Sequence, residues 1–209
     1  MEQLQNGKLF PLFPVPVYRP DKQYILNKEE IDFVSNQKTY KNVAQNSTSY
    51  NTRVLDDVAF SSLRKHIQTQ IDTYAKDVLK VDYSKVKINI TQSWINYNNK
   101  NTAHHHHSHP NSIISGVFFI VGDECPIAFD RYVKLFDNLR IPQTDFETYI
   151  TSERYRFSNE QGYMYLFPST LKHSVQINQS DKTRISLSFN TFAKGKLGSE
   201  GTLDALEIK

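Results

Sequence analysis

The spacing of apolar residues changes along the chain, and each change predicts a different element. Residues 57–79 carry apolar side chains every three to five positions, which predicts an amphipathic helix with one face against a sheet. Over residues 86–97 the spacing becomes two, as expected for a strand. Upstream, Asn27 and Glu30 have the spacing of a helix N-cap and its capping partner, so a short helix should begin after Asn27.

Further strand-like runs follow in the second half of the chain, at residues 113–121, 127–130, 163–167, 174–178 and 183–192. Short strands that follow helices predict an α+β chain built on an antiparallel sandwich or barrel. The three prolines in residues 9–18 favour an extended segment at a sheet edge. The polar, aromatic and poorly periodic region 130–160 is expected to form a rim or lid that selects the substrate.

Composition narrows the class of protein. The chain has 209 residues, of which 38% are hydrophobic and 12% aromatic, and this predicts a packed core. The 25 basic and 22 acidic residues give a net charge of only +3, which argues against nucleic acid as a partner. The longest apolar run, residues 117–121, is far shorter than the ~18 residues of a membrane helix. The single Cys125 excludes an intramolecular disulfide framework and favours a reducing, cytoplasmic location.

Histidine is the residue with the most chemical information. Five of the seven histidines fall within residues 103–110, AHHHHSHP. Alternate residues of a strand face the same side, so His107 and His109 could hold one metal ion together. The pair His105 and His107 offers a competing register. His66 lies among charged residues of the long helix, where a surface position is expected instead of a metal ligand.

A second group of candidate residues lies near the end of the chain. His173 is placed between two strand-like runs, and Arg184 follows it by eleven residues. On the run 183–192, Arg184 and Ser186 share the polar face. In an ordinary sandwich that face would meet solvent. If it instead lines the inside of a barrel, the buried arginine needs an anionic partner.

These residues carry a family resemblance. The order His-x-His, His, Arg-x-Ser is similar to that of the double-stranded β-helix dioxygenases that use iron(II) and 2-oxoglutarate. The segments SWINYNN, HSHPNSIISGVFFI, IAFDR, LFPSTLKHSV and DKTRISLSFNTF resemble more closely the 2-oxoglutarate/iron(II) oxygenases that carry an HxHP segment. The likeness covers the chain from about Ser93 onward, and its blocks are specific only when taken together.

The resemblance implies a fold, a reaction and a set of site residues. The fold would be a double-stranded β-helix, a jelly-roll or cupin-like barrel with N-terminal helices packed on one sheet. A single domain would span residues 1–209, with helices and an extended segment in 1–80, the β-helix core in 86–192 and a tail in 193–209. The chain would couple oxidative decarboxylation of 2-oxoglutarate to hydroxylation of an unknown substrate. The implied roles are iron(II) binding by His107, His109 and His173, and cosubstrate binding by Arg184, Ser186 and Asn96.

The metal site departs from the common pattern in one respect. The better-known oxygenases have His-x-Asp or His-x-Glu, so two histidines and one carboxylate surround the iron. Here His109 stands where the carboxylate would be. Asp130, on the next candidate strand, is the nearest substitute carboxylate, and we prefer His109 over it.

Two other readings compete with the oxygenase. A cupin-type metal protein or enzyme that does not use 2-oxoglutarate would explain the histidines. However, cupins normally have a glutamate shortly after HxH, which this sequence lacks, and a cupin site would give Arg184 no role. A non-catalytic binding module on the same fold would need neither metal nor cosubstrate. The expected partners are 2-oxoglutarate, dioxygen and a substrate, with no membrane. The extended N-terminal segment or the tail could reach a second copy, so a homodimer remains open.

Overall fold

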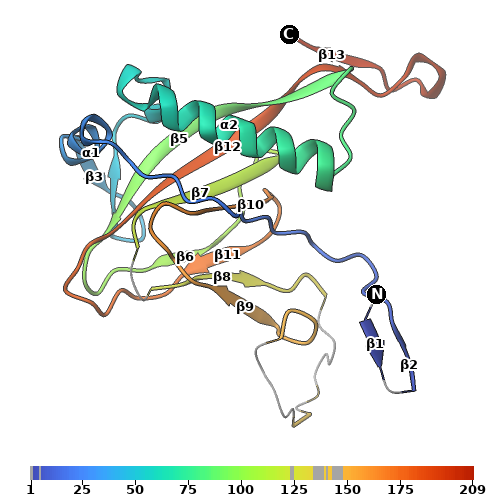
Figure 1. Ribbon diagram of the computed structural model, residues 1–209, viewed down its shortest axis with the longest axis horizontal. Helices are drawn as coiled ribbons and strands as arrows, with labels where there is room; N and C mark the ends of the chain where they lie inside the picture. The colour runs from blue at the N-terminus through green and yellow to red at the C-terminus, as the bar shows by residue number, and fades with distance from the viewer. Residues whose placement is uncertain (1, 5, 123–124, 134–138, 140, 143–147) are drawn as a thin grey trace.

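The structure, a computed structural model, describes residues 2–4, 6–122, 125–133, 139, 141–142 and 148–209. Most of its strands form two antiparallel sheets (Figure 1). The larger sheet consists, from edge to edge, of β10 (Met164–Pro168), β7 (Ile114–Val121), β12 (Arg184–Leu197), β5 (Val86–Asn98), β4 (Ser47–Ser49) and β3 (Thr39–Lys41), with β13 (Leu206–Ile208) paired to β12. The smaller sheet consists of β6 (His104–His107), β11 (His173–Val175), β8 (Ile127–Asp130) and β9 (Arg154–Phe157). A separate hairpin joins β1 (Glu2–Leu4) and β2 (Gly7–Leu9).

The short helix α1 (Lys28–Ser35) begins where the sequence predicts. Asn27 Oδ1 accepts a hydrogen bond from the Glu30 N–H at 2.9 Å, and Glu30 Oε2 accepts one from the Asn27 N–H at 2.8 Å. This reciprocal pair satisfies two backbone donors that the first turn would otherwise leave without partners. The capping prediction is confirmed.

The long helix is less regular than predicted. Two 3₁₀ turns, η1 (Val54–Asp56) and η2 (Val58–Phe60), precede α2 (Ser61–Thr73), which continues as a π-helical turn, η3 (Tyr74–Val78). The apolar period therefore marks the packed face correctly, but not one continuous α-helix. A last 3₁₀ turn, η4 (Glu200–Thr202), lies near the C-terminus. None of the helices in the described part of the chain is long and apolar enough to cross a membrane.

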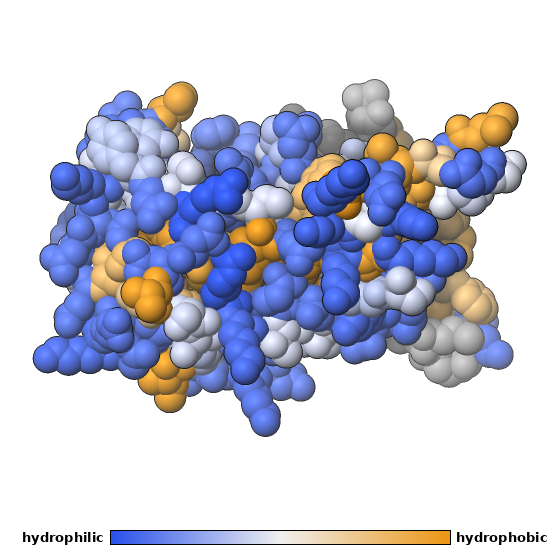
Figure 2. All heavy atoms as spheres, turned by 90° about the horizontal axis from the view of Figure 1, so that it is seen from above, coloured by the Kyte–Doolittle hydropathy of each residue, from blue (hydrophilic) through white to orange (hydrophobic). Residues whose placement is uncertain are grey.

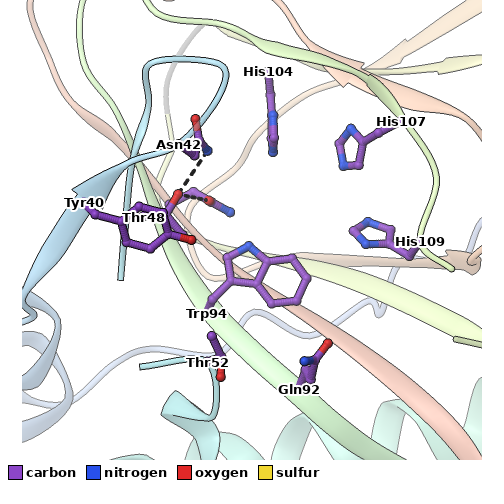
Figure 3. A pocket seen from close by; sticks show the side chains of 10 residues that line it. Tyr40, Asn42, Thr48, Thr52, Gln92, Trp94, His104, His107 and His109 are labelled. Carbon is purple, nitrogen blue, oxygen red and sulfur yellow. Dashed lines mark hydrogen bonds between the residues drawn. The ribbon is translucent and has the colours of Figure 1, made fainter. Parts of the chain in front are cut away.

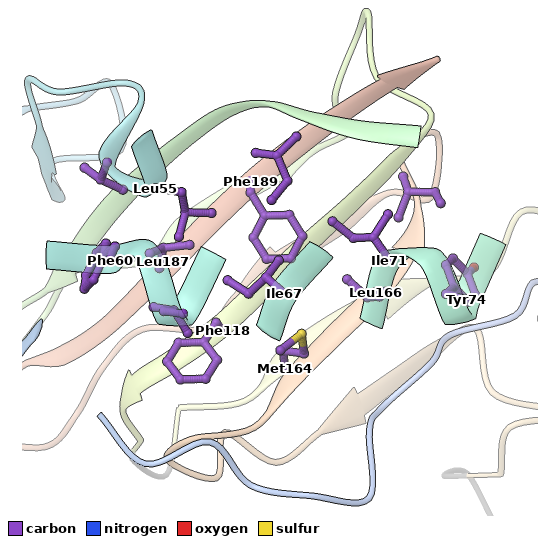
Figure 4. Packing of buried hydrophobic residues seen from close by; sticks show 14 of the residues in the cluster. Leu55, Phe60, Ile67, Ile71, Tyr74, Phe118, Met164, Leu166, Leu187 and Phe189 are labelled. Carbon is purple, nitrogen blue, oxygen red and sulfur yellow. The ribbon is translucent and has the colours of Figure 1, made fainter. Parts of the chain in front are cut away.

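The main hydrophobic core lies between α2 and the outer face of the larger sheet (Figure 4). Ile67 and Ile71 of α2 are fully buried against sheet residues that include Phe118, Leu187 and Phe189. Above α2 the surface is mainly hydrophilic, with scattered apolar side chains (Figure 2). The helices thus cover one face of the larger sheet and leave its other face to the smaller sheet.

A second, smaller core fills part of the space between the two sheets. Val117 and Phe119 of β7 pack there with Phe129 of β8 and Phe167 of β10. On β12 the residues alternate as predicted, because Leu187 belongs to the helix-side core while Arg184 lies over the ring of Phe119. The polar face of β12 therefore points between the sheets, and the alternative of a solvent-facing polar face is wrong.

Region 130–160 is not a simple loop. β9 lies within it and pairs with β8 from Ile127 opposite Phe157 to Asp130 opposite Arg154. The prediction of a rim or lid missed this strand, because its aromatic residues alternate with arginines inside a polar stretch. Part of the predicted lid, residues 134–138, 140 and 143–147, lies outside the described residues.

The proline-rich segment, residues 9–18, ends in an extended conformation at the edge of the larger sheet. There Tyr18 exchanges two backbone hydrogen bonds of 2.9 Å with Leu166 of β10.

Candidate metal centre

Two neighbouring strands of the smaller sheet bring the distant histidines together. β6 ends at His107, and the pairing of β6 with β11 sets His107 directly opposite His173. His109 comes two residues after the end of β6, and its N–H donates to the Ser169 carbonyl at 2.9 Å. The expectation that His107 and His109 share one strand is therefore wrong, although both imidazoles reach the same place.

The three imidazoles form a compact cluster. One ring nitrogen from each of His107, His109 and His173 lies within 4.8 Å of the other two. The Nε2 atoms of His109 and His173 are 3.3 Å apart, and the rings of His107 and His173 have centroids 4.3 Å apart. Three neutral imidazole nitrogens at this spacing form a donor set that suits a first-row divalent metal such as iron(II).

Backbone carbonyls orient two of these rings. The Nδ1 of His107 donates to the His105 carbonyl at 2.8 Å, and the Nδ1 of His173 donates to the Leu171 carbonyl at 3.0 Å. A hydrogen bond at Nδ1 fixes the tautomer and leaves the Nε2 lone pair free for a metal. The chain thus supplies the outer partners that metal-binding histidines usually have.

The surroundings also keep the imidazoles neutral. Burial, with a smaller contribution from the positive charge that neighbouring imidazoles would carry, lowers the pKa of His109 to about 3 and that of His173 to about 4. Burial is also the main cause that lowers the pKa of His107. Neutral imidazole is the form that binds metal, so the cluster is ready for an ion at neutral pH.

The two alternative ligands are directed elsewhere. Asp130 accepts hydrogen bonds from His106 Nδ1 at 2.6 Å and from Arg154 Nε at 2.8 Å, so both of its oxygens are engaged in an ion-paired group outside the cluster. His105 is exposed; its carbonyl accepts from His107 Nδ1, and its ring lies beside the His107 ring with the centroids 5.2 Å apart, but it is not part of the group of three ring nitrogens. The described geometry therefore favours His109 as the third member.

A fourth histidine, His104, faces the same interior, and the sequence reasoning missed it. Along β11, His173 and Val175 are two positions apart, whereas their partners His107 and His104 are three positions apart on β6, so β6 contains a bulge. The bulge turns His104 and His107 to the same side and leaves His105 outside. The Nδ1 of His104 is buried and has no hydrogen-bond partner among the described residues. A bulge is not visible in a strand periodicity, so only the density of histidines hinted at this residue.

Arg184 lies beside this histidine, deep between the sheets. Arg184 is 1% exposed to solvent, and its Nη1 donates to Asn98 Oδ1 and to Ser186 Oγ, each at 3.1 Å. Burial, with smaller contributions from neighbouring histidines and the Arg184 guanidinium, lowers the pKa of His104 to about 3. A permanent positive charge thus stands near the cluster without being part of it. The predicted residues Arg184 and Ser186 are in mutual contact.

A cavity of about 290 Å³ opens beside the cluster (Figure 3). Trp94 stands in its middle, between the histidines on one side and Tyr40 and Thr48 on the other. Asn96, the third predicted cosubstrate residue, lines it and is held by Thr48 and Ser188 at 3.1 and 3.2 Å. The lining residues are Tyr40, Asn42, Thr48, Thr52, Gln92, Trp94, Asn96, His104, His107 and His109.

Comparison with known families gives one match. Residues 92–190, which hold the whole histidine cluster and Arg184, match the family described as "Putative 2OG-Fe(II) oxygenase". No curated protein sequence matches this one. The matched residues run from the middle of β5 into β12, so they include the cluster, whereas Tyr40, Asn42, Thr48 and Thr52 of the cavity lining come before them.

Solved structures of low sequence identity share the fold. The carbocyclase SnoK from nogalamycin biosynthesis, described as non-heme and alpha-ketoglutarate dependent, aligns with a TM-score of 0.57 at 13% identity, over 93% of this chain and 90% of its own. HygX from Streptomyces hygroscopicus, with nickel, 2-oxoglutarate and hygromycin B bound, aligns with a TM-score of 0.57 at 8% identity, over 85% and 83%. A prolyl-4-hydroxylase from Pseudomonas putida aligns with a TM-score of 0.52 at 8% identity, over 85% and 94%.

Proposed function

We propose that this chain, which belongs to the 2OG-Fe(II) oxygenase family, performs the family's reaction at the cluster of His107, His109 and His173. The family uses iron(II) as its metal and 2-oxoglutarate as its cosubstrate. In the reaction, dioxygen gives one oxygen atom to the succinate that forms as 2-oxoglutarate loses carbon dioxide. The other atom enters a C–H bond of the substrate as a hydroxyl group. The observation that carries the proposal is the convergence of three neutral imidazoles beside a buried arginine.

In this proposal the three histidines hold the iron. Their Nε2 atoms would supply three ligands and would leave room for oxygen donors. The set carries no negative charge, so it would not offset the +2 charge of a bound ion. We expect it to attract the dianionic cosubstrate more strongly than a site with one carboxylate would. Bound iron would supply the chemistry that activates dioxygen.

Arg184 is proposed to bind the distal carboxylate of 2-oxoglutarate. Its guanidinium is buried near the cluster, and a carboxylate there would provide a partner of opposite charge. Ser186 touches the same guanidinium and is proposed to add a hydroxyl. Asn98 belongs to this group as well, because its Oδ1 accepts from Arg184 Nη1 and helps to fix the side chain.

His104 and Asn96 are proposed to line the space between these two anchors. Both border the cavity next to His107, and His104 is close enough to Arg184 for their charges to interact. The buried Nδ1 of His104 offers a hydrogen bond that no described residue uses. We therefore expect His104 to contact bound 2-oxoglutarate between its two ends. Asn96 would line the cavity on the same side.

The broader expectations belong to this proposal too. Two facing antiparallel sheets with helices on one outer face support a double-stranded β-helix, with residues 1–209 as a single domain. The lone Cys125 supports a cytoplasmic location. A homodimer stays open as a prediction.

An anaerobic titration tests the proposal. Iron(II) and 2-oxoglutarate are added together, and the charge-transfer absorbance of the chelated pair is followed; admission of air should then yield succinate. Stoichiometric binding of both compounds followed by succinate formation supports the oxygenase. Metal binding without any response to 2-oxoglutarate would favour a cupin-type metal protein, and binding of neither would leave a binding module.

A further inference from the structure

The cavity beside the cluster extends away from Arg184, and this open half is not needed to hold 2-oxoglutarate. Along β5, Asn98 is paired with Arg184, Asn96 with Ser186, and Gln92 lies farther along the same face. Six residues of strand span about 20 Å, so Gln92 and Arg184 mark opposite ends of the interior. The cavity lining includes Gln92 and Thr52 but not Arg184. The half around Gln92 is therefore free for a second molecule.

That open half leads outward. Tyr40, Thr52 and Gln92 line the cavity and are exposed, whereas Asn96 and Thr48 at the inner end are buried. Trp94 lies between them, half-buried, with its ring 5.9 Å from that of His109 (Figure 3). A molecule that enters past Gln92 would rest on the indole and present its inner edge to the histidines. This is the arrangement that a substrate needs.

The lining contains none of the four residue types that carry a full charge at neutral pH. None of its ten residues is Asp, Glu, Lys or Arg. A charged substrate group would lose hydration on entry and gain no counter-charge from these residues.

The lining also offers unused hydrogen-bonding groups around one aromatic ring. Within the described part of the chain, the Gln92 amide, the Thr52 hydroxyl and the indole N–H of Trp94 have no hydrogen-bond partner. A purely apolar substrate would leave these groups dry and unpaired. Hydroxyl groups both donate and accept, as do the amide and the threonine hydroxyl around the ring. The C–H face of a saturated ring packs well on an indole.

We propose that the open half of the cavity binds the substrate, and that this substrate is a neutral, polyhydroxylated ring compound of the size of one sugar or cyclitol. Binding of this compound does not depend on the proposed oxygenase function. Its hydroxylation, at the carbon nearest the histidines, rests on that proposed function. The volume of about 290 Å³ lies at the lower end of small-molecule pockets, which suits one ring better than a polymer.

The test uses the only tryptophan of the chain as the reporter. Because Trp94 lines the cavity, its fluorescence should change when a ligand stacks on it, with or without iron. Methyl β-glucopyranoside and myo-inositol are the neutral probes, glucuronic acid and glucosamine the charged ones, and uracil is a flat neutral ring without a sugar. The neutral polyols should bind more tightly than all three others. Equal or tighter binding of a charged probe or of uracil, or no response to either polyol, would overturn the proposal.

Variants localise the effect. Gln92→Ala should weaken polyol binding about threefold to tenfold, the amount expected for one lost hydrogen bond. Gln92→Glu should reverse the preference, so that glucosamine binds more tightly than the neutral glucoside. Gln179→Ala, at an exposed position outside the lining, is the matched control and should bind as the parent does. Unchanged preference in Gln92→Glu would place the ligand elsewhere.

Succinate measurements separate this inference from the proposed function. If the polyols bind at Trp94 but iron and 2-oxoglutarate yield no succinate, the oxygenase assignment fails while the binding site stands. If succinate forms but neither polyol changes the Trp94 signal, the oxygenase stands and the substrate class is wrong.

Discussion

The Nε2 atoms of His109 and His173 lie 3.3 Å apart, although 64 residues separate them along the chain. Because the Nδ1 of His173 already donates to a backbone carbonyl, its Nε2 carries a lone pair. His109 must then hold a proton at its own Nε2 to make this contact favourable in the metal-free protein. A metal ion would bind both Nε2 atoms, so the ring proton of His109 would have to move to its Nδ1. Because both imidazoles are already neutral, metal binding should release no proton near neutral pH.

Loss of one imidazole should disrupt the metal site. His173→Ala removes the most buried of the three rings, and we expect stoichiometric iron(II) binding to disappear, as measured by equilibrium dialysis with iron analysis. His105→Ala is the matched control from the same histidine run, because its imidazole is exposed and the substitution keeps the backbone carbonyl that accepts from His107 Nδ1. Equal iron content in His173→Ala and the parent would refute the ligand assignment.

His104 should act on the cosubstrate and not on the metal. In His104→Ala the 2-oxoglutarate affinity should fall several-fold, because one hydrogen bond and one wall of the cavity are lost, while iron content stays at one ion per chain. His104→Asn, which keeps a polar atom close to the position of the ring Nδ1, should restore part of the affinity. A loss of iron in both variants would instead make His104 a ligand.

Acid should destabilise the metal-free protein. In the folded chain the pKa of His109 is about 3 and that of His173 about 4, against about 6.5 in the unfolded chain. Above pH 6.5 both states are neutral and these groups contribute nothing. As the pH falls from 6.5 toward 4, the unfolded chain binds protons that the folded chain does not, so the free energy of unfolding should decrease. Urea denaturation at pH 7.5 and pH 5 measures this, and His109→Asn should flatten the dependence.

Gly116 tests the packing of the larger sheet. A methyl group at this position would meet the ring of Phe189 and the side chain of Leu166, both fully buried. Gly116→Ala should therefore lower the free energy of unfolding by about 1–3 kcal/mol, the usual cost of overpacking a core. Gly201→Ala introduces the same methyl group in open space and should change stability by less than about 0.5 kcal/mol. Similar losses in both variants would contradict the packing described.

The strand alternation in the sequence predicted much of the site, and local irregularities account for what it missed. The two-residue period predicted for residues 86–97 and 183–192 holds in β5 and β12, and it correctly set Arg184 and Ser186 on a common face. The same rule failed on β6, because a bulge changes which residues face inward, and so it overlooked His104. His109 reaches the cluster through one backbone hydrogen bond to Ser169, a long-range contact that no local pattern contains.

The choice between an oxygenase and a metal-only protein depends most directly on Arg184. Its guanidinium should hold the distal carboxylate of 2-oxoglutarate through a planar, two-pronged contact that lysine cannot reproduce. The decisive measurement is the anaerobic titration of 2-oxoglutarate into the iron-loaded parent, Arg184→Lys and Arg184→Ala, followed by charge-transfer absorbance. We expect all three to hold iron, with cosubstrate affinity reduced strongly in Arg184→Lys and about a hundredfold in Arg184→Ala. If Arg184→Ala keeps its iron and binds 2-oxoglutarate as tightly as the parent, the proposed role of this residue is contradicted, and with it the main distinction from a cupin-type metal protein.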